Sequence, residues 1–173
     1  VLEKISGQKV QGFRAPYYSI SKENFWALDV MKKFLKYDSS IFPVRTPLYG
    51  IPGAPRFIYR MSDTNPLKND DNSNFIEIPP ATLKISGFGN LAIAGGFHLR
   101  VLPVWLLKIG INKLNKEGHP AMCYIHPHDL DPNKPRIKEY PSRAYWGIKG
   151  SAKKFESLIK SYKFSSAREV VLR

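Results

Sequence analysis

The order of hydrophobic and polar positions along the chain predicts three amphipathic helices. The first covers residues 22–36 after the N-cap Ser21, and the second runs from Pro103 to about residue 117, where Gly118 ends it. A third helix follows the N-cap Ser151. Apolar side chains recur every three or four residues in each segment, which predicts one buried stripe per helix. The stripes consist of Trp26, Leu28, Val30, Met31, Phe34 and Leu35, of Trp105, Leu106, Ile109 and Leu114, and of Phe155, Leu158, Ile159 and Tyr162.

Short apolar runs between these helices predict β-strands. Residues 75–78 form one such run, and residues 169–172 form a possible edge strand. Residues 121–126 are predicted to be a buried central strand, because their apolar run is too short for a buried helix. Cys123 within this run is expected to be a small buried apolar residue. Further short strands are indicated by Leu83, Ile85, Leu91, Ile93 and Phe97. This mixture of helices and strands predicts an α/β fold.

Composition narrows the classes of function. The chain has 173 residues, of which 43% are hydrophobic, as in a globular domain. The net charge of +13 comes from cations scattered from Lys4 to Lys163, which favours a solvated surface over a nucleic-acid site. No apolar run reaches the ~20 residues of a membrane span, and a single cysteine excludes an internal disulfide. We therefore expect no nucleic-acid partner and no membrane span.

Candidate chemistry gathers at the carboxyl end of the predicted strand 121–126. His126, His128, Asp129 and Asp131 lie within six residues there. Carboxyl ends of strands carry the catalytic groups of α/β barrels and sheets. A lone histidine at a strand end is more often structural, but two histidines with two aspartates favour a functional site. Arg14, Asp38, His126 and the backbone around Tyr17 are the groups expected to converge.

Five motifs in this order carry a resemblance to a known family. They are GFRAPYY (12–18), WALDVMKKFLKYDSSIFP (26–43), YGIPGAPRF (49–57), AGGFHLRVLP (94–103) and YIHPHDLDP (124–132). Together they resemble bacterial polysaccharide deacetylases of the NodB-homology family, in the subgroup found with exopolysaccharide and exosortase loci.

The resemblance implies the C-terminal portion of a deformed (β/α) barrel that is incomplete at its N-terminus. Residues 1–42 would be the end of the barrel core. Residues 43–173 would be a subgroup-specific region with the last catalytic strand (121–126) and the terminal amphipathic helix.

The resemblance also implies the activity and the roles of site residues. A full-length member would remove N-acetyl groups from an amino-sugar polymer in bacterial exopolysaccharide synthesis, on the cytoplasmic or the cell-envelope side. Arg14 would hold the aspartate that acts as base, and the Tyr17 backbone N–H would stabilise the oxyanion. His126 would be the general acid that protonates the departing amine, and Asp38 would pair with His126 and keep it charged. The predicted substrate-binding residues are Pro16, Tyr18 and Trp146.

The metal site of the family has no counterpart in this chain. Members hold a divalent metal, usually zinc, with an Asp-Asp pair and a His-x-x-x-His pair upstream of the GFRAPYY motif. Residues 1–13 contain no Asp and no His, and Val1 is not an initiator methionine. We therefore expect the metal ligands in a missing N-terminal part of the same domain. The expected partners are that part and an N-acetylated polysaccharide or oligosaccharide, and the chain alone is expected to be inactive.

Two alternatives from other classes remain open. His126, His128 and Asp129 could themselves hold the metal of a different hydrolase, since His-x-His at a strand end opens several zinc sites. The chain could also be a basic domain that binds carbohydrate or nucleic acid without catalysis. Its aromatic contacts would then come from Tyr17, Trp26, Trp105 and Trp146, of which Trp26 and Trp105 are predicted to be core residues.

Overall fold

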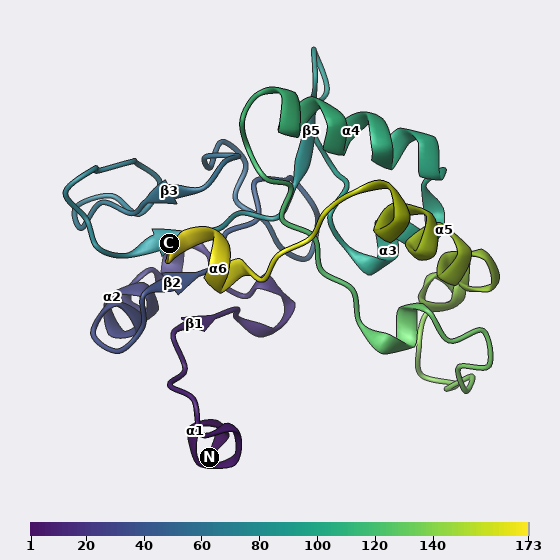
Figure 1. The fold of residues 1–173 in the computed structure, drawn as a ribbon, viewed down its shortest axis with the longest axis horizontal. Helices are drawn as coiled ribbons and strands as arrows, with labels where there is room; N and C mark the ends of the chain where they lie inside the picture. Colours follow the sequence, from purple (N-terminus) through teal and green to yellow (C-terminus); the bar gives the residue numbers. More distant parts are fainter. Residues whose placement is uncertain (173) are drawn as a thin grey trace. The chain divides into compact units, whose positions relative to one another are not determined.

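The computed structural model describes residues 1–172 and divides the chain into two compact units. Unit 1 comprises Val1–Pro80 and the C-terminal segment from Ser166, and unit 2 comprises Ala81–Ser165. Both units mix helices with short strands, which confirms the α/β class (Figure 1). The described residues form no closed barrel.

Unit 1 is organised around a four-stranded mixed sheet in the order β1-β2-β4-β3. Strands β1, β2 and β4 are parallel, and β3 is antiparallel to β4. Phe13 is opposite Asp38, which in turn is opposite Glu77. The carboxyl ends of three parallel strands therefore meet at one edge. The strands are β1 (Gly12–Phe13), β2 (Tyr37–Asp38), β3 (Tyr59–Arg60) and β4 (Ile76–Glu77), and the predicted run 75–78 contains β4.

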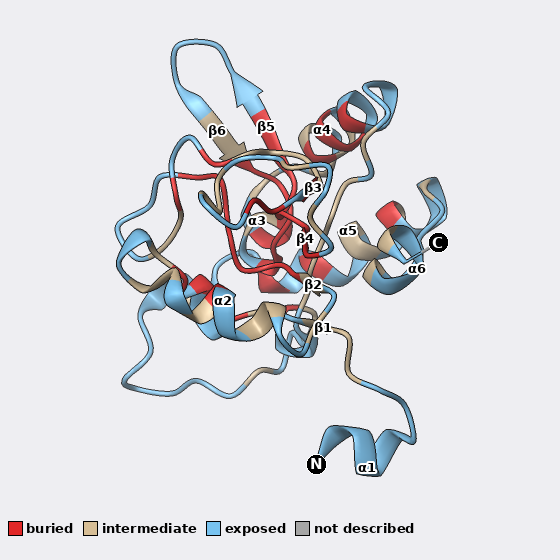
Figure 2. Cartoon of the chain, turned by 90° about the vertical axis from the view of Figure 1, so that its left-hand side faces the viewer, coloured by how far each residue is buried: buried red, intermediate tan, exposed pale blue. Residues whose placement is uncertain are grey.

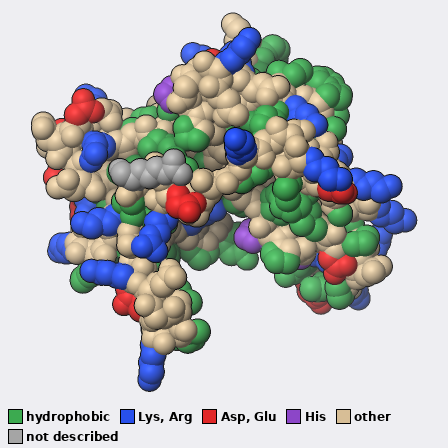
Figure 3. Space-filling model, viewed as in Figure 1, with side chains coloured by type: hydrophobic (Ala, Val, Ile, Leu, Met, Phe, Trp, Pro, Cys, Tyr) green, Lys and Arg blue, Asp and Glu red, His purple; other side chains and the backbone are tan. Residues whose placement is uncertain are grey.

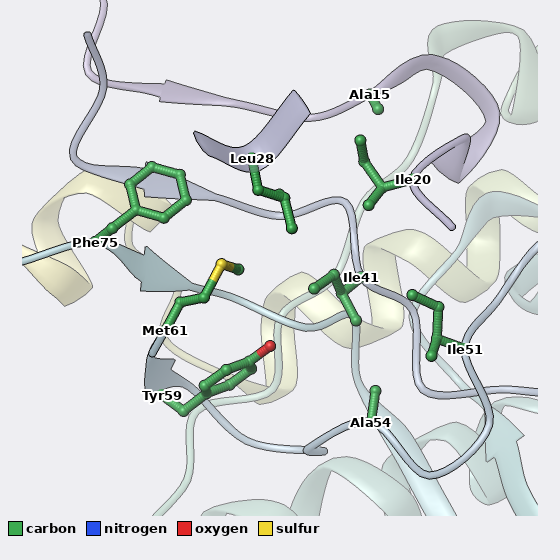
Figure 4. Packing of buried hydrophobic residues seen from close by; sticks show 9 residues of the cluster. All are labelled: Ala15, Ile20, Leu28, Ile41, Ile51, Ala54, Tyr59, Met61 and Phe75. Carbon is green, nitrogen blue, oxygen red and sulfur yellow. The ribbon is translucent and has the colours of Figure 1, made fainter. Parts of the chain in front are cut away.

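The core of unit 1 lies between this sheet, helix α2 (Trp26–Lys32) and the proline-rich loops. Figure 4 shows the side chains of this cluster pointing toward one another. Burial of such side chains contributes about 1.5–3 kcal/mol each for the larger ones. The cluster consists of Ala15, Ile20, Leu28, Ile41, Ile51, Ala54, Tyr59, Met61 and Phe75.

Helix α2 buries a different stripe from the predicted one. The segment begins with the 3₁₀ helix η2 (Lys22–Asn24), capped by Ser21, and α2 ends at Lys32. Leu28 is fully buried, but Trp26, Val30 and Phe34 are exposed. Positions 28 and 30 are about 200° apart around a helix, so the two apolar rows cannot face one core. The row with Leu28 packs inward, and the prediction of Trp26 as a core residue was wrong.

Unit 2 contains a β-hairpin and three helices. Strands β5 (Thr82–Ile85) and β6 (Gly89–Ala92) confirm two of the short strands that the sequence indicated, and they pair antiparallel. Helix α4 packs beside β5. The helices are α3 (Gly96–Val101), α4 (Val104–Lys116) and α5 (Ile148–Ser161), with the 3₁₀ helices η3 (Pro127–Asp129) and η4 (Ser142–Tyr145) between them. Figure 2 shows the buried residues on one side of α4 and the exposed residues on the other.

The predicted helix after Pro103 is confirmed, but its buried face differs from expectation. Pro103 is the N-cap and Glu117 the C-cap of α4. Leu107, Ile111 and Leu114 are buried, whereas Trp105 and Ile109 are exposed, so Trp105 is not a core residue. Gly110 lies on the buried face, where a Cβ atom would be 2.4 Å from the Ile93 side chain. The helix therefore approaches the hairpin through a glycine.

Five other predictions in the two units were wrong. Residues 121–126 form no strand, because only Met122 and Tyr124 make backbone hydrogen bonds to neighbouring segments, and Cys123 is only half-buried. Phe97 belongs to helix α3. Ser151 lies inside α5, which begins after the N-cap Gly147, and its hydroxyl donates to backbone carbonyls. Residues 169–172, which were predicted to form an edge strand, do not form one.

The C-terminal segment of unit 1 is helical instead. Helix α6 (Ala167–Val171) begins at Ser166, whose hydroxyl accepts from the Glu169 N–H while the Glu169 carboxylate accepts from the Ser166 N–H. This capping box satisfies two backbone donors at the helix start, which favours a helix over a strand. Helix α1 (Leu2–Ser6) at the other end of the chain has no buried residue. None of the described helices combines the length and the apolar character that crossing a membrane requires.

Candidate functional site

Arg14, Asp38 and Glu77 come together at the carboxyl edge of the parallel strands. Arg14 directly follows β1, Asp38 ends β2, and Glu77 ends β4. The pairing places Asp38 between the ends of β1 and β4. This edge is where α/β proteins collect catalytic side chains.

Arg14 is fixed to the end of β2 by Ser39. Its Nε donates to the Ser39 carbonyl oxygen at 3.1 Å, and its Nη2 donates to the Ser39 Oγ at 2.8 Å. Ser39 Oγ in turn donates to the Ile78 carbonyl oxygen at 2.6 Å. Three neighbouring strand ends are thus joined by one chain of hydrogen bonds. Ser39 and its neighbour Ser40 were not singled out from the sequence.

Asp38 is fully buried and its carboxylate is held by Ser40. Oδ1 accepts from the Ser40 hydroxyl at 2.7 Å, and Oδ2 accepts from the Ser40 N–H at 3.1 Å. Ser40 Oγ also accepts from the Ala15 N–H at 2.8 Å, so it bridges the ends of β1 and β2. Burial raises the pKa of Asp38, and the hydrogen bonds from Ser40 and Glu77 oppose that rise.

Glu77 is a second fully buried carboxyl group at the same edge. Its Oε1 accepts from the Ile41 N–H at 3.0 Å. Burial and the neighbouring charge of Asp38 raise the pKa of Glu77 well above its usual range, and the strand register places these two residues side by side. Sequence reasoning missed Glu77, since a single glutamate in a short apolar strand carries no signal of its partner.

Tyr17 lies on a sharp turn at the same end of β1. The 3₁₀ helix η1 (Pro16–Tyr18) has left-handed backbone angles at both tyrosines, with φ of 57° and 53°. The N–H groups of Tyr18 and Ser19 close the turn on carbonyl oxygens. Among residues 1–172 the Tyr17 N–H has no hydrogen-bond partner, and 91% of Tyr17 is exposed. An N–H without an internal partner beside the strand edge is the kind of donor that an oxyanion requires.

The two predicted substrate-binding residues on this turn differ in exposure. Pro16 is exposed next to Tyr17. Tyr18 is buried, and its ring packs against Phe42 and Tyr49 at centroid distances of 5.0 and 5.7 Å. Tyr18 therefore supports the turn from below, and contact of either residue with a substrate stays a prediction.

His126 and His128 form an exposed pair in unit 2. Their rings are stacked, with centroids 5.2 Å apart and planes within 5°. The His126 N–H donates to Asp129 Oδ2 at 3.2 Å, which closes the turn of η3. Burial lowers the pKa of His128, and the nearby cations lower it further against the opposing charge of Asp129. The imidazole of His126 is thus presented to solvent from a fixed backbone.

Asp129 and Arg100 fix both this turn and the loop that carries Trp146. Arg100 Nε lies 3.0 Å from Asp129 Oδ1, with both side chains buried. Arg100 Nη1 donates to the carbonyl oxygens of Ala144 and Trp146, each at 3.0 Å. His126 and Trp146 are therefore attached, through their backbones, to the same ion pair. Trp146 itself is 56% exposed.

Comparison with known protein families places the chain in one of them. A family model described as a domain of unknown function, DUF3473, matches residues 39–172. The chain belongs to this family. No curated protein and no solved structure matches the chain. The part that matches DUF3473 begins immediately after Asp38, so Arg14, Tyr17 and Asp38 precede it.

The predicted catalytic residues of this DUF3473 protein fall into two sets. Arg14, Tyr17 and Asp38 gather in unit 1, and His126 and Trp146 gather in unit 2. The expected pair of Asp38 with His126 would join the two units and stays a prediction. Within unit 1, Asp38 is hydrogen-bonded to Ser40 and lies beside Glu77, and the sequence revealed neither neighbour.

The described part of the chain offers no set of side chains suited to a divalent metal ion. Among residues 1–172 no three His, Cys, Asp or Glu side chains are placed to hold one ion. Asp129, the carboxylate proposed for an alternative site with His126 and His128, faces the guanidinium of Arg100. A metal ligand must be free of such a partner, so this cluster makes a poor metal site.

Proposed function

We propose that this chain is the C-terminal part of a polysaccharide deacetylase, which hydrolyses N-acetyl groups of an amino-sugar polymer in bacterial exopolysaccharide synthesis. The parallel edge of β1, β2 and β4 would be the end of a deformed (β/α) barrel. One observation carries the proposal: Arg14, the Tyr17 N–H and Asp38 converge at the carboxyl ends of neighbouring parallel strands. The resemblance to deacetylases implies a site made of these residues at the carboxyl ends of the strands.

Each of these groups has a task in amide hydrolysis. The acetamide carbonyl oxygen gains negative charge when it is attacked, and the Tyr17 N–H would donate to it. The departing amine needs a proton, which His126 would supply, and Asp38 would accept a hydrogen bond from the charged imidazole. Arg14 would keep the strand edge in place through Ser39. The divalent metal that the resemblance implies would be held by residues outside this chain.

The test measures acetate release from N-acetylated oligosaccharides by the full-length protein. His126→Ala should lower the rate by roughly a hundred- to ten-thousand-fold while the bound metal is retained. His128→Ala is the matched control, because His128 is stacked on His126 on the same exposed turn and should leave the rate within a few fold. An active His126→Ala variant, or loss of metal from it, would refute the assignment of His126.

A second candidate function is favoured by the surface of unit 2. This unit has 14 Lys and Arg residues and five Asp and Glu residues, so it carries a formal charge of +9 out of +13. Lys134 and Arg136 lie over the ring of Tyr145, close to the exposed Trp146. On the face shown in Figure 3, Lys and Arg side chains (blue) are dispersed between exposed hydrophobic side chains (green). Basic and aromatic groups together suit an anionic polysaccharide.

The two candidates are separated by binding measured without turnover. If unit 2 only binds carbohydrate, Trp146→Ala should lower the affinity for the polysaccharide. Neither Trp146→Ala nor His126→Ala should then change the rate of acetate release by the full-length protein. A deacetylase would lose acetate release in His126→Ala and keep its affinity for the polysaccharide.

A further inference from the structure

Two carboxyl groups lie side by side at the candidate site with no cation bonded between them. Asp38 and Glu77 are opposite each other on adjacent parallel strands, and both are 0% exposed. The described hydrogen bonds of Arg14 to this edge go to Ser39, and its charge acts on Glu77 without a direct bond. If both carboxyl groups were ionised, neither negative charge would be hydrated, and the two would repel each other. Ionisation of both groups therefore has a high free-energy cost.

The hydrogen bonds show which group carries the proton. The carboxylate of Asp38 accepts two donors from Ser40, one on each oxygen. Glu77 accepts a single donor, Ile41 N–H, on Oε1, and its buried Oε2 has no donor among residues 1–172. Donors stabilise the charged form of a carboxyl group, and Asp38 has twice as many. A proton on Glu77 Oε2, donated to Asp38, satisfies every polar atom of the pair.

Strand β3, which pairs with β4 beside the two carboxyl groups, adds no charge to them. Tyr59 on β3 is opposite Glu77, and burial together with the two carboxyl groups raises its pKa, so the phenol stays neutral. Its hydroxyl donates away from the pair, to the Pro66 carbonyl oxygen at 2.6 Å. Arg14, which acts on Glu77, is therefore the one cation that acts on the pair from the described part of unit 1.

We infer that Asp38 and Glu77 act as one unit with a single proton and a single negative charge, and that Glu77 is a positioning residue that keeps Asp38 a charged acceptor. The role of this unit in deacetylation rests on the proposed function, whereas the shared proton does not. In the proposed reaction, a charged Asp38 would accept a hydrogen bond from the imidazolium of His126. If Glu77 were ionised instead, its negative charge would raise the proton affinity of Asp38. Asp38 would then carry the shared proton and could no longer accept the hydrogen bond from His126 as a carboxylate.

The shared proton is tested by infrared spectroscopy on the full-length protein. At pH 7 exposed carboxyl groups are ionised, so a carbonyl band of a protonated carboxylic acid reports a buried one. The wild type should show this band and Glu77→Gln should lose it, while the glutamine can still donate to Asp38 and accept from the Ile41 N–H. Glu139→Gln, which changes an exposed glutamate, is the matched control and should keep the band. A wild type without the band at pH 7, or a band that persists in Glu77→Gln, would overturn the inference.

The positioning role is tested by kinetics of the same variants. Glu77→Ala should lower kcat about 10- to 100-fold with little change in KM, as removal of outer hydrogen-bond partners does at other sites, and Glu77→Gln should restore most of the rate. Equal losses in both variants would overturn the positioning role. A band that disappears in Glu77→Gln in a protein without any deacetylase activity would support the shared proton and refute the proposed function.

Discussion

Arg100 and Asp129 form a buried ion pair in unit 2, with 3.0 Å between Nε and Oδ1. The Nε–H does not have hydrogen-bond geometry toward the carboxylate, so the contact is electrostatic, and the hydrogen bonds of the guanidinium come from Nη1. Asp129 lies so close to helix α3 that a Cβ on Gly96 would collide with its carboxylate. This pair joins α3, the His126 turn and the Trp146 loop, three segments far apart in sequence.

Removing one partner of this pair should strongly destabilise the protein. Arg100→Met leaves the carboxylate of Asp129 buried without its cation, and we expect a loss of about 3–5 kcal/mol in the free energy of unfolding, measured by urea denaturation. Lys160→Met is the control, because it breaks an exposed pair with Glu156 and should cost less than about 0.5 kcal/mol. Equal losses in the two variants would show that the Arg100 pair is not structural.

Ser40→Ala should weaken the edge of the sheet in unit 1. The substitution removes the hydroxyl that donates to Asp38 and accepts from the Ala15 N–H, and it leaves that buried N–H without its partner. We expect a loss of about 1–3 kcal/mol in the free energy of unfolding. Ser19→Ala changes an exposed serine a short distance away and is the control. A Ser40→Ala protein as stable as this control would contradict the bridging role of the hydroxyl.

Glu77 should make the stability of the protein fall as the pH rises. The pKa of Glu77 is higher in the folded chain than the value of 4.5 for an unperturbed glutamate. Its contribution is therefore complete below pH 4.5 and is lost as the pH rises toward the folded pKa, by at most about 1.4 kcal/mol per pH unit. The stability of Glu77→Gln relative to the wild type should increase from pH 5 to pH 8, as measured by chemical denaturation. Parallel pH curves for the two proteins would exclude a raised pKa.

His98 should have the opposite effect at acid pH. Burial lowers the pKa of His98 from 6.5 to about 4, and its Nδ1 has no partner among the described residues. The folded state binds this proton less well than the unfolded state, so stability falls as the pH drops below 6.5, by roughly 3 kcal/mol in total. His98→Asn should flatten the stability curve between pH 7 and pH 5. His119→Asn is the control, and an unchanged slope in His98→Asn would contradict the prediction.

The bounds of helix α4 could be predicted from its terminal residues, whereas the start of α5 and the buried faces of the helices could not. Pro103 and Gly118 bracket α4 as expected, because capping chemistry is local to the chain. Which apolar row faces the core depends on the neighbour that packs there. Leu28 and Leu107 face inward while Trp26 and Trp105 face outward, although all four are apolar and regularly spaced.

The candidate site could also be predicted only in part: two of its residues were found from the sequence, and their partners were not. Arg14 and Asp38 lie at the same strand edge, as expected, because each follows or ends a short strand. The partners of Asp38 could not be found in this way, since Glu77 is 39 positions away and only the register of β2 with β4 brings it close. The run 121–126 failed as a strand for the same reason: an apolar run forms a strand only where a neighbouring segment pairs with it along its length.

The backbone strain of the turn at Tyr17 and Tyr18 lowers the stability of the protein but fixes the direction of the Tyr17 N–H. Two successive non-glycine residues in left-handed conformations cost about 1–3 kcal/mol each, and packing of the Tyr18 ring on Phe42 and Tyr49 opposes that cost. A substitution such as Tyr17→Gly would relieve the strain and raise the melting temperature. It would also loosen the direction of the Tyr17 N–H, so under the proposed deacetylase function a more heat-resistant variant selected at this turn is expected to release acetate more slowly.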